Sequence, residues 1–269
     1  MQRTIIRPFD GSLADAEGLL AVERESFDES PYSAEQVRVL MSGGAQHAWL
    51  AVDEGQVVGF VIAFATAGLS DPCWEIDLLA VHPDWTGRGL ATRLIRAASA
   101  YGMRLAHQAR AAVATDNSAS ARAFLRAGYR RAGLCELLIF RSGKQIPRPW
   151  AALGVIIREA VDARDAARWL TPIPGPGTRW SAARDVAWAE GSLAPSGSAT
   201  VRERGDLTLL LAEHHGQPAG YAELIAVQTL LYRGVWIESF SASGDLVAAA
   251  LIHEAVQRAA STGLDEIGM

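Results

Sequence analysis

One block of the sequence occurs twice, and this repeat limits what the chain can fold into. The pattern Leu-Ala-x3-Gly-Gln-x2-Gly-aromatic covers residues 50–60 and recurs over residues 211–221. The Ile-Ile-Arg of residues 5–7 also recurs, at residues 156–158, and the spacing from Asp15 to Leu20 equals that from Asp165 to Leu170. Several matches in one order predict a tandem duplication.

The first copy shows an ordered series of expected strands and helices. A short strand and two helices are followed by a hairpin around residues 54–56, and then strands alternate with helices. We expect strands at 4–8, 49–53, 57–65, 74–81, 110–114 and 136–141, and helices at 13–25, 33–42, 89–103 and 119–127. A meander followed by strand-helix alternation indicates an α/β or α+β fold whose later strands pair in parallel.

A short linker is expected to separate the two copies. Residues 143–150 contain two prolines and a glycine, which is typical of a connection between domains. We therefore predict domains at residues 1–145 and 150–269. The second copy stops before the counterparts of the last helix and strand of the first, so we expect it to be truncated. We expect it either to pack against the first copy or to form a wall of the acceptor site.

The overall composition excludes several classes of protein. The chain has 269 residues, 25 Lys and Arg, 30 Asp and Glu, and a net charge of −5, which argues against a dedicated nucleic-acid binder. It lacks the apolar run of about 18 residues that a membrane span needs, and its first residues are not expected to be a secretory signal. Its two cysteines, Cys73 and Cys135, form no CxxC pair, so we expect a cytoplasmic protein without a metal site.

The net charge hides a local separation of acidic and basic residues. Residues 10–29 contain seven acids and one arginine, whereas residues 87–131 contain nine arginines and one acid. Surface charge on helices is the simplest explanation for each residue alone. A basic segment nevertheless suits an anionic ligand such as a polyphosphate if a phosphate-binding loop lies within it.

Such a loop is predicted where the strand ending at Val81 leads into the next helix. Residues 82–89 include the turn Thr86-Gly87-Arg88-Gly89, and a helix is expected to start there. Free N–H groups at a helix start, together with the helix dipole, form a binding site for a phosphate. The preceding strand carries two acids, because alternation places Glu75 and Asp77 on one face with residues 73, 79 and 81. Either carboxylate is suited to accept a proton from an ammonium group.

Residues 3–142 resemble the GNAT superfamily of N-acetyltransferases. The phosphate loop of that family, Gln/Arg-x-x-Gly-x-Gly/Ala, matches residues 86–91, with Thr86 at its first position. Its later pattern, Asn-x6-Tyr-x3-Gly-Phe, matches Asn117, Phe124, Gly128 and Tyr129 in spacing, with the two aromatic types exchanged. The resemblance implies the GNAT fold, a mixed sheet with splayed central strands and flanking helices, here duplicated in tandem.

The resemblance also implies acetyl-CoA as co-substrate and assigns residues to it. The backbone of Leu79, Ala80 and Val81 would bond the pantetheine arm. The remaining implied cofactor contacts are Gly87, Arg88, Gly89, Leu90, Ala91 and Thr92 for the pyrophosphate, and Asn117 and Phe124 for the distal part. Glu75 matches the general base of the histone-acetyltransferase branch, and Asp77 is the second candidate.

Phe124 departs from the family pattern in a way that affects the mechanism. Many members have a tyrosine there that protonates the departing thiolate, and a phenyl ring cannot do so. A thiol pKa of about 8.5 makes thiolate a tolerable leaving group without a strong acid. Water, Tyr129, Ser118 or Ser120 remain alternatives.

Two functions follow from these patterns. The first is an acetyl-CoA-dependent transferase acting by direct attack of a primary amine, on a small molecule or a peptide. The second is a non-catalytic acyl-CoA-binding or regulatory protein. In the second copy only Gly244 remains of the loop and Asp245 follows it, so we expect no acetyl-CoA there.

Overall fold

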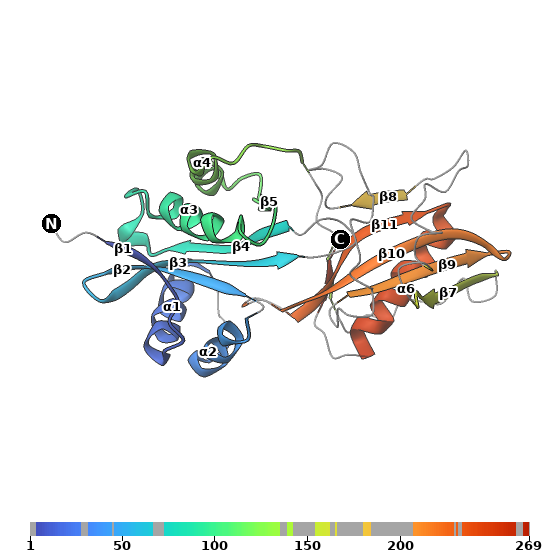
Figure 1. Cartoon of the computed structure of the whole chain (residues 1–269), viewed down its shortest axis with the longest axis horizontal. Coiled ribbons are helices and arrows are strands. Elements are labelled where there is room, and N and C mark those ends of the chain that lie inside the picture. Colours follow the sequence, from blue (N-terminus) through green and yellow to red (C-terminus); the bar gives the residue numbers. More distant parts are fainter. Residues whose placement is uncertain are drawn as a thin grey trace. The chain divides into compact units, whose positions relative to one another are not determined.

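The computed structural model of the chain describes most of the first half of the sequence and several blocks of the second. The described residues are 4–27, 32–44, 46–66, 73–134, 139–141, 154–161, 165, 180–183, 207–228, 230, 233–261 and 266–268. They form two compact units, one containing the described residues up to Arg131 and the other those from Ala132 onward. Each unit has its own sheet and its own hydrophobic core (Figure 1).

The first unit contains a five-stranded mixed sheet in the order β1-β2-β3-β4-β5. Its strands are β1 (Ile5–Pro8), β2 (His47–Asp53), β3 (Gln56–Thr66), β4 (Cys73–Val81) and β5 (Gln108–Arg110). The first four pair antiparallel, and β5 joins β4 in parallel. The predicted meander followed by a parallel strand is thus confirmed, although β5 ends at Arg110, where a strand was expected to begin.

Helices α1 (Leu13–Ser26) and α2 (Ala34–Ser42) cover one face of this sheet (Figure 1). A serine starts each helix: the side chain of Ser12 accepts a hydrogen bond from the third residue of α1, and Ser33 forms a capping box at α2. Such caps satisfy N–H groups that have no partner within the helix. The start of α1 predicted at Leu13 and the end of α2 predicted before Gly43 are both confirmed.

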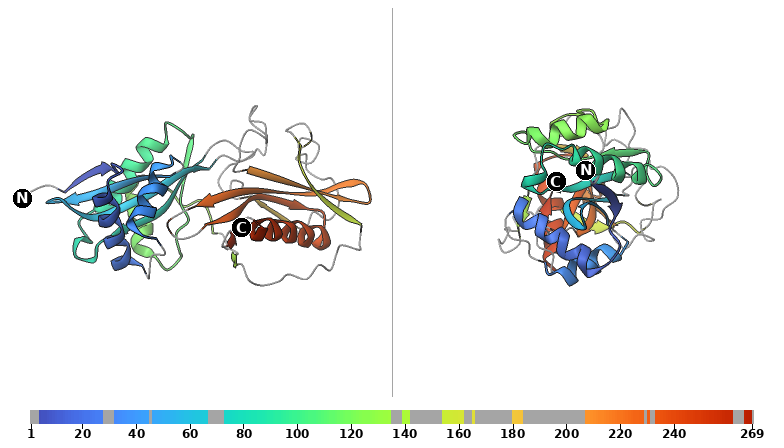
Figure 2. Two further views of the ribbon diagram at one scale, coloured as in Figure 1. Left: turned by 90° about the horizontal axis from the view of Figure 1, so that it is seen from below. Right: turned by 90° about the vertical axis from the view of Figure 1, so that its left-hand side faces the viewer.

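Helices α3 (Leu90–Gly102) and α4 (Ser118–Ala127) cover the opposite face, which an end-on view shows as three layers (Figure 2). Leu94 and Ile95 of α3 are fully buried against the sheet, and α4 adds Phe124 to the same core. Apolar residues three and four positions apart in α3 produce this buried stripe. The layers fix the position of β4, whose end leads into α3.

A β-bulge interrupts β4. Ile62 of β3 lies opposite Leu78, but the next residue, Ala63, lies opposite Ile76, so Asp77 is an extra residue on β4. A bulge bends its strand and reverses the alternation of side chains beyond it. The bulge therefore turns the side chains of the second half of β4 to the opposite faces of the sheet.

The predicted face of β4 is wrong for this reason. Trp74 and Ile76 belong to the core beneath α3, and beyond the bulge Leu79 and Val81 pack against that same core. Uninterrupted alternation had placed these two residues on the face of Glu75. The alternation of side chains is thus reversed between the two halves of β4. Glu75 therefore lies on the face opposite to Leu79 and Val81.

The second unit contains a seven-stranded sheet in the order β6-β12-β11-β10-β9-β7, with β8 also pairing with β11. Its elements are β6 (Ile139–Arg141), β7 (Val155–Glu159), β8 (Trp180–Ala183), β9 (Leu207–His214), β10 (Gln217–Gln228), β11 (Arg233–Ala242), α6 (Asp245–Ser261) and β12 (Glu266–Gly268). Leu251 and Ala255 of α6 are fully buried in its core. The two sheets and their helices confirm the predicted α/β class and are consistent with a tandem arrangement.

The strand expected at residues 136–141 is not part of the first sheet. Its described residues form β6, which pairs antiparallel with β12 in the second unit. The domain limits 1–145 and 150–269 remain predictions, and the proposed linker lies outside the described residues. None of the helices in the described part of the chain has the length and apolar character needed to cross a membrane.

Candidate active site

The loop after β4 has the backbone shape that a phosphate-binding turn needs. A short 3-10 helix, η1 (Pro83–Trp85), leads into Gly87 and Gly89, which both have φ of +75°. Side chains rarely tolerate this left-handed region, which explains a glycine at each position. A Cβ built at either glycine would have no atom within 4 Å, so the space in front of the turn is open.

Helix α3 starts at this turn without a side-chain cap. Gly89 is its N-cap residue and supplies no side-chain hydrogen bond, unlike Ser12 and Ser33 at the other face of the sheet. The first-turn N–H groups and the helix dipole therefore favour an anion. The hydroxyl of Thr92 is directed elsewhere, because its Oγ1 donates to the carbonyl of Ala123 at 3.4 Å. Among the predicted loop residues, the backbone N–H groups are therefore the groups available to an anion.

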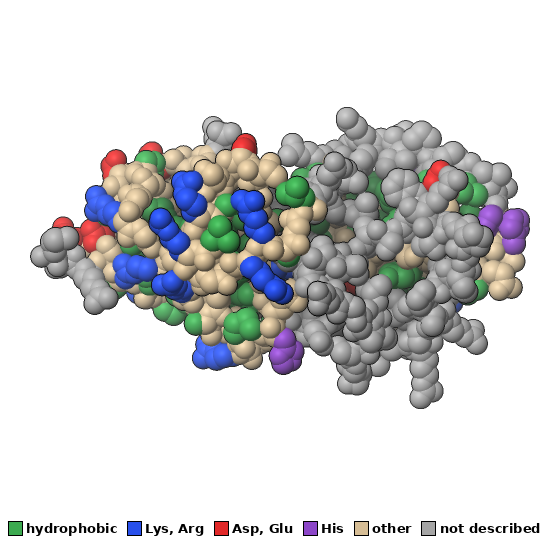
Figure 3. Space-filling view, turned by 90° about the horizontal axis from the view of Figure 1, so that it is seen from above, with side chains coloured by type: hydrophobic (Ala, Val, Ile, Leu, Met, Phe, Trp, Pro, Cys, Tyr) green, Lys and Arg blue, Asp and Glu red, His purple; other side chains and the backbone are tan. Residues whose placement is uncertain are grey.

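Arg88 folds back onto its own loop. Its Nη2 donates to the carbonyl of Asp84 at 3.0 Å, and its guanidinium lies 5.6 Å from the ring centre of Trp85. Figure 3 shows basic side chains distributed over this face of the first unit. The exposed arginines of the loop and of α3, α4 and the turn between them are Arg88, Arg96, Arg104, Arg122 and Arg126. The predicted basic segment is thus largely a surface beside the loop.

The edge of β4 that faces β5 is only partly paired. β5 accompanies β4 for three residues, the last pair being Glu75 and Arg110. Along Leu78–Val81 no strand among the described residues lies on that edge, while β3 occupies the other edge. An open strand edge offers N–H and C=O groups to an extended ligand. This stretch contains Leu79, Ala80 and Val81, and it ends at the loop before α3.

Glu75 is engaged in a buried ion pair. Its Oε2 accepts a hydrogen bond from Nε of Arg110 at 2.7 Å, and both side chains are almost completely buried. The guanidinium compensates a carboxylate that would otherwise be costly to bury. The structure therefore gives Glu75 an evident role in joining β4 to β5.

Asp77 has a different environment. It is the extra residue of the bulge and is partly exposed, so solvent reaches it. A partly exposed carboxylate beside an open strand edge can exchange protons with solvent, which a general base requires. Glu75 is thus buried before the bulge, whereas Asp77 is partly exposed at the bulge itself.

Asn117 and Phe124 have structural roles in α4. Oδ1 of Asn117 accepts a hydrogen bond from the N–H of Ser120 at 3.0 Å and so caps the helix. Phe124 is buried, and its ring meets that of Tyr129 edge-on, with centres 5.1 Å apart. Asn117 thus caps α4 and Phe124 packs this helix into the core, and neither side chain needs a ligand to explain its place.

Two of the hydroxyl groups considered as alternatives to a tyrosine at position 124 are also engaged. Tyr129 and Ser99 share a hydrogen bond of 2.8 Å between their oxygens. Burial raises the pKa of Tyr129 above 10, although the hydrogen bond with Ser99 acts in the opposite direction. Oγ of Ser118 accepts from Arg122 at 3.1 Å. Tyr129 is thus a neutral phenol and a weaker acid than a free tyrosine.

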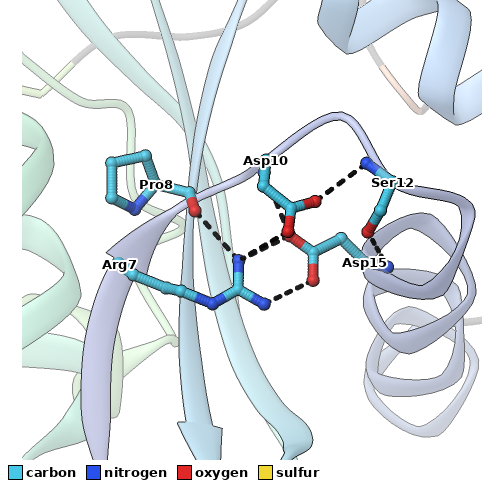
Figure 4. Close-up of polar contacts among 5 residues, drawn as sticks. All are labelled: Arg7, Pro8, Asp10, Ser12 and Asp15. Carbon is cyan, nitrogen blue, oxygen red and sulfur yellow. Dashed lines mark hydrogen bonds and ion pairs between the residues drawn. The ribbon is translucent and has the colours of Figure 1, made fainter.

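The acidic segment near the N-terminus is partly structural. Asp15 accepts hydrogen bonds from both terminal nitrogens of Arg7, at 2.6 and 2.5 Å, and from the N–H of Asp10 at 3.0 Å (Figure 4). This network ties β1 to α1 and neutralises the charge of Asp15. Glu23 is fully buried in α1. The segment therefore presents less negative charge to solvent than its composition predicts.

Sequence reasoning missed Arg110 as the partner of Glu75. Arg110 was counted among the basic residues available to a phosphate, but it is the one fully buried arginine of that segment in the described part of the chain. Two opposite charges on neighbouring parallel strands were the available signal. The strand limits expected at residue 110 concealed it, because the register could not be read from the sequence.

Comparison with known proteins gives a family match within the first unit. The sequence model of the Acetyltransferase (GNAT) family matches residues 16–129. No curated protein sequence matches the chain.

Solved structures of acetyltransferases resemble the chain at low sequence identity. A GCN5-related glucosamine N-acetyltransferase region of a fungal multi-domain GH3 β-N-acetylglucosaminidase has a TM-score of 0.58 at 15% identity, covering 100% of this chain and 35% of that one. The aminoglycoside acetyltransferase meta-AAC0020 from an uncultured soil metagenomic sample has a TM-score of 0.45 at 16% identity, covering 53% and 97%. The aminoglycoside N-acetyltransferase AAC(6')-Iy in complex with CoA has a TM-score of 0.43 at 16% identity, covering 52% and 100%.

The first of these structures aligns with this chain over its full length, whereas the family match is confined to the first unit. The open edge of β4 and the uncapped start of α3 lie within the matched residues. Residues 16–129 therefore match the GNAT acetyltransferase family, and this match supports an acyltransferase.

Proposed function

We propose that the first unit binds acetyl-CoA and transfers its acetyl group to a primary amine. One observation carries this proposal: the edge of β4 left open beyond Glu75 leads directly to the uncapped start of α3. An extended arm with amide groups fits the former, and a phosphate fits the latter. Acetyl-CoA combines the two in one molecule.

The residues present fit this co-substrate. The backbone of Leu79, Ala80 and Val81 would bond the pantetheine amides, and the backbone from Gly87 to Thr92 would hold the pyrophosphate. The absence of Cβ atoms at Gly87 and Gly89 lets a phosphate approach closely. The exposed arginines beside the loop add a favourable field for its negative charge.

Direct attack of the amine on the thioester carbonyl requires no covalent enzyme intermediate. The unit's contribution is to place the two reactants together and to remove a proton from the amine. Deprotonating a lysine-like amine with a pKa of about 10.4 costs about 4.6 kcal/mol of free energy at pH 7. The general base must help to meet this cost. We assign that role to Asp77 before Glu75, because Asp77 is partly exposed whereas Glu75 is buried against Arg110.

The departing thiolate needs no tyrosine at position 124. Its conjugate acid has a pKa of about 8.5, so water can protonate it after the bond has broken. Tyr129 is a poor alternative, since burial raises its pKa and its hydroxyl is hydrogen-bonded to Ser99. The acceptor is proposed to be a small molecule or a peptide with a primary amine, and the protein to act in the cytoplasm.

The second unit is proposed to be a degenerate copy of the first. Arg158 binds Asp165 through both terminal nitrogens, at 2.5 and 2.7 Å, and the N–H of Val161 donates to the same carboxylate. This repeats the arrangement of Arg7, Asp15 and Asp10. In each case hydrogen bonding to the aspartate raises the pKa of the arginine. The proposed domains remain residues 1–145 and 150–269, packed against each other.

Calorimetric titration with acetyl-CoA, followed by a thiol-release assay over a panel of amines, tests the function. Gly89→Ala should weaken acetyl-CoA binding, because its Cβ enters the space proposed for a phosphate. Gly44→Ala is a matched control: Gly44 also has φ of +75° and no atom within 4 Å of a built Cβ, but it lies beyond α2. Equal loss of acetyl-CoA affinity in both variants would contradict the assignment of the loop.

A non-catalytic acyl-CoA-binding protein is the second candidate. The burial of Glu75 against Arg110 and the phenyl ring of Phe124 favour it, because both remove a group that family members use in catalysis. Acetyl-CoA binding without thiol release on any amine class would support this candidate. Acetyl transfer that decreases in the Asp77→Asn variant would exclude this second candidate.

A further inference from the structure

The second unit contains a strand that corresponds to β4. On β11, Ser239 lies opposite Glu223 of β10 and Ile237 lies opposite Leu224, so Glu238 is the extra residue of a bulge. The bulge on β4 has the same form, with Asp77 as the extra residue. Counting from the two bulges, Ser239–Ala242 correspond to Leu78–Val81.

Further contacts give the same correspondence. The residue after β11, Ser243, donates its N–H to the carbonyl of Ala219, and the residue after β4, His82, donates to that of Val58. Both acceptors lie two residues beyond the start of the neighbouring strand. A helix then follows in each unit, α3 or α6.

The two strands differ in what lies along one edge. β10 occupies one edge of β11, and β12 occupies the first part of the other, ending at the pair Trp236 and Gly268. The rest of that edge is taken by β8, whose residues 180–183 pair antiparallel with Ser239–Ala242. In the first unit the pairing of β5 with β4 likewise ends, at the pair Glu75 and Arg110. No strand among the described residues lies beside Leu78–Val81 on that edge. β8 thus pairs with the four residues that correspond to the open stretch of β4 (Figure 1).

We propose that β8 occupies, in the second unit, the slot that the pantetheine arm of acyl-CoA takes in the first. This inference rests on the proposed function, because it assumes that the open edge of β4 is the pantetheine site. The chain then binds one acyl-CoA, and its second slot is closed by the chain's own backbone.

The physical basis is competition for one strand edge. Both β8 and a pantetheine arm bond to a strand through amide groups, so the two cannot be present together. β8 belongs to the same chain, which gives it an effective concentration of the order of millimolar or more relative to a free ligand. The start of α6 adds to this preference, since Asp245 brings negative charge to the position corresponding to the anion site.

Hydrogen exchange with single-residue resolution, together with binding stoichiometry, tests the proposal on the full chain. Acetyl-CoA should slow exchange of the amides within 78–81 that face the open edge, by about tenfold or more at saturation. The amides within 239–242 that face β8 should exchange slowly without ligand and should not respond to it. Titration should give one acetyl-CoA per chain.

A variant of β8 provides the second measurement. Neighbouring residues of a strand point their N–H groups to opposite sides, so Ser181→Pro combined with Ala182→Pro removes one β8 donor to β11. Exchange within 239–242 should rise by about tenfold or more, whereas exchange within 78–81 and its response to acetyl-CoA should not change.

The outcomes separate this inference from the proposed function. Two bound acetyl-CoA per chain with ligand protection at both segments would overturn the inference and support the function. Fast exchange within 239–242 in the unmodified protein would overturn the inference as well. No acetyl-CoA binding would overturn the proposed function, and the inference with it, whatever the exchange at 239–242.

Discussion

The buried ion pair between Glu75 and Arg110 allows a quantitative test of how the first unit uses its β4 carboxylates. The two side chains are 4% and 1% exposed, and Nε lies 2.7 Å from Oε2. Glu75→Gln or Arg110→Gln alone removes this ion pair and leaves the other charge buried, which should cost about 3–5 kcal/mol of unfolding free energy. The double variant buries two neutral amides, so it should be less destabilised than either single variant, with a coupling energy of at least about 2 kcal/mol.

Urea unfolding of the full chain, followed by tryptophan fluorescence, measures this cycle. Trp74 is fully buried next to Glu75 in β4, and it is one of the eight tryptophans that contribute to this signal. Glu35→Gln makes the same chemical change in the exposed ion pair with Arg38. Exposed pairs contribute about 0–1 kcal/mol, so this control should change the unfolding midpoint little.

The same variants distinguish a positioning role for Glu75 from a catalytic one. If Glu75 only joins β4 to β5, the stable double variant should retain acetyl transfer within about tenfold of the unmodified enzyme. A general base contributes about 10²–10⁴-fold, so a loss of that size despite recovered stability would show that Glu75 abstracts the proton. Additive free energies in the cycle would refute the ion-pair reasoning itself.

Three further changes have defined outcomes. Burial lowers the pKa of His47 below 6.5, so its protonation opposes folding; stability should fall as pH decreases below about 6.5, and His47→Gln should remove that part of the slope of urea midpoint against pH. Tyr129→Phe removes the hydrogen bond with Ser99 and should cost about 1 kcal/mol in urea unfolding, while a loss of acetyl transfer of about 100-fold would instead identify Tyr129 as the acid. Asp15→Asn weakens the pairing with Arg7 and should cost about 1.5–3 kcal/mol by the same unfolding assay, with acetyl-CoA affinity unchanged in calorimetry.

Features set by neighbouring residues could be predicted from the sequence. The serine caps of α1 and α2, the hairpin turn at Glu54 and Gly55, and the glycine turn before α3 all depend on a few adjacent residues. Glu54 and Gly55 both have positive φ, as a two-residue hairpin turn requires. The outline of the site follows from these elements, because the predicted loop and strand are consecutive in the chain.

Features set by pairing between distant residues could not be predicted. The bulge at Asp77 is visible only once β3 and β4 are in register, and it reverses the face assigned to Leu79 and Val81. The contact of Arg110 with Glu75 needs the parallel register of β4 and β5. From composition alone, Arg110 was counted among the basic residues available to bind a phosphate. A charged residue's role depends on its partner, which the linear order does not show.

Comparison of the two units bears on why the ion pair is there. The residue two positions before the bulge is Glu75 on β4 and Trp236 on β11, and their parallel neighbours are Arg110 and Gly268. A Cβ at Gly268 would lie 2.4 Å from the ring of Trp236, so the indole covers the glycine. The second unit thus closes the corresponding place by apolar packing. Since buried ion pairs often stabilise no better than such packing, the fold alone does not require Glu75 and Arg110. The charged pair lies at the last residues that β4 and β5 share, so it marks the position at which these two strands separate.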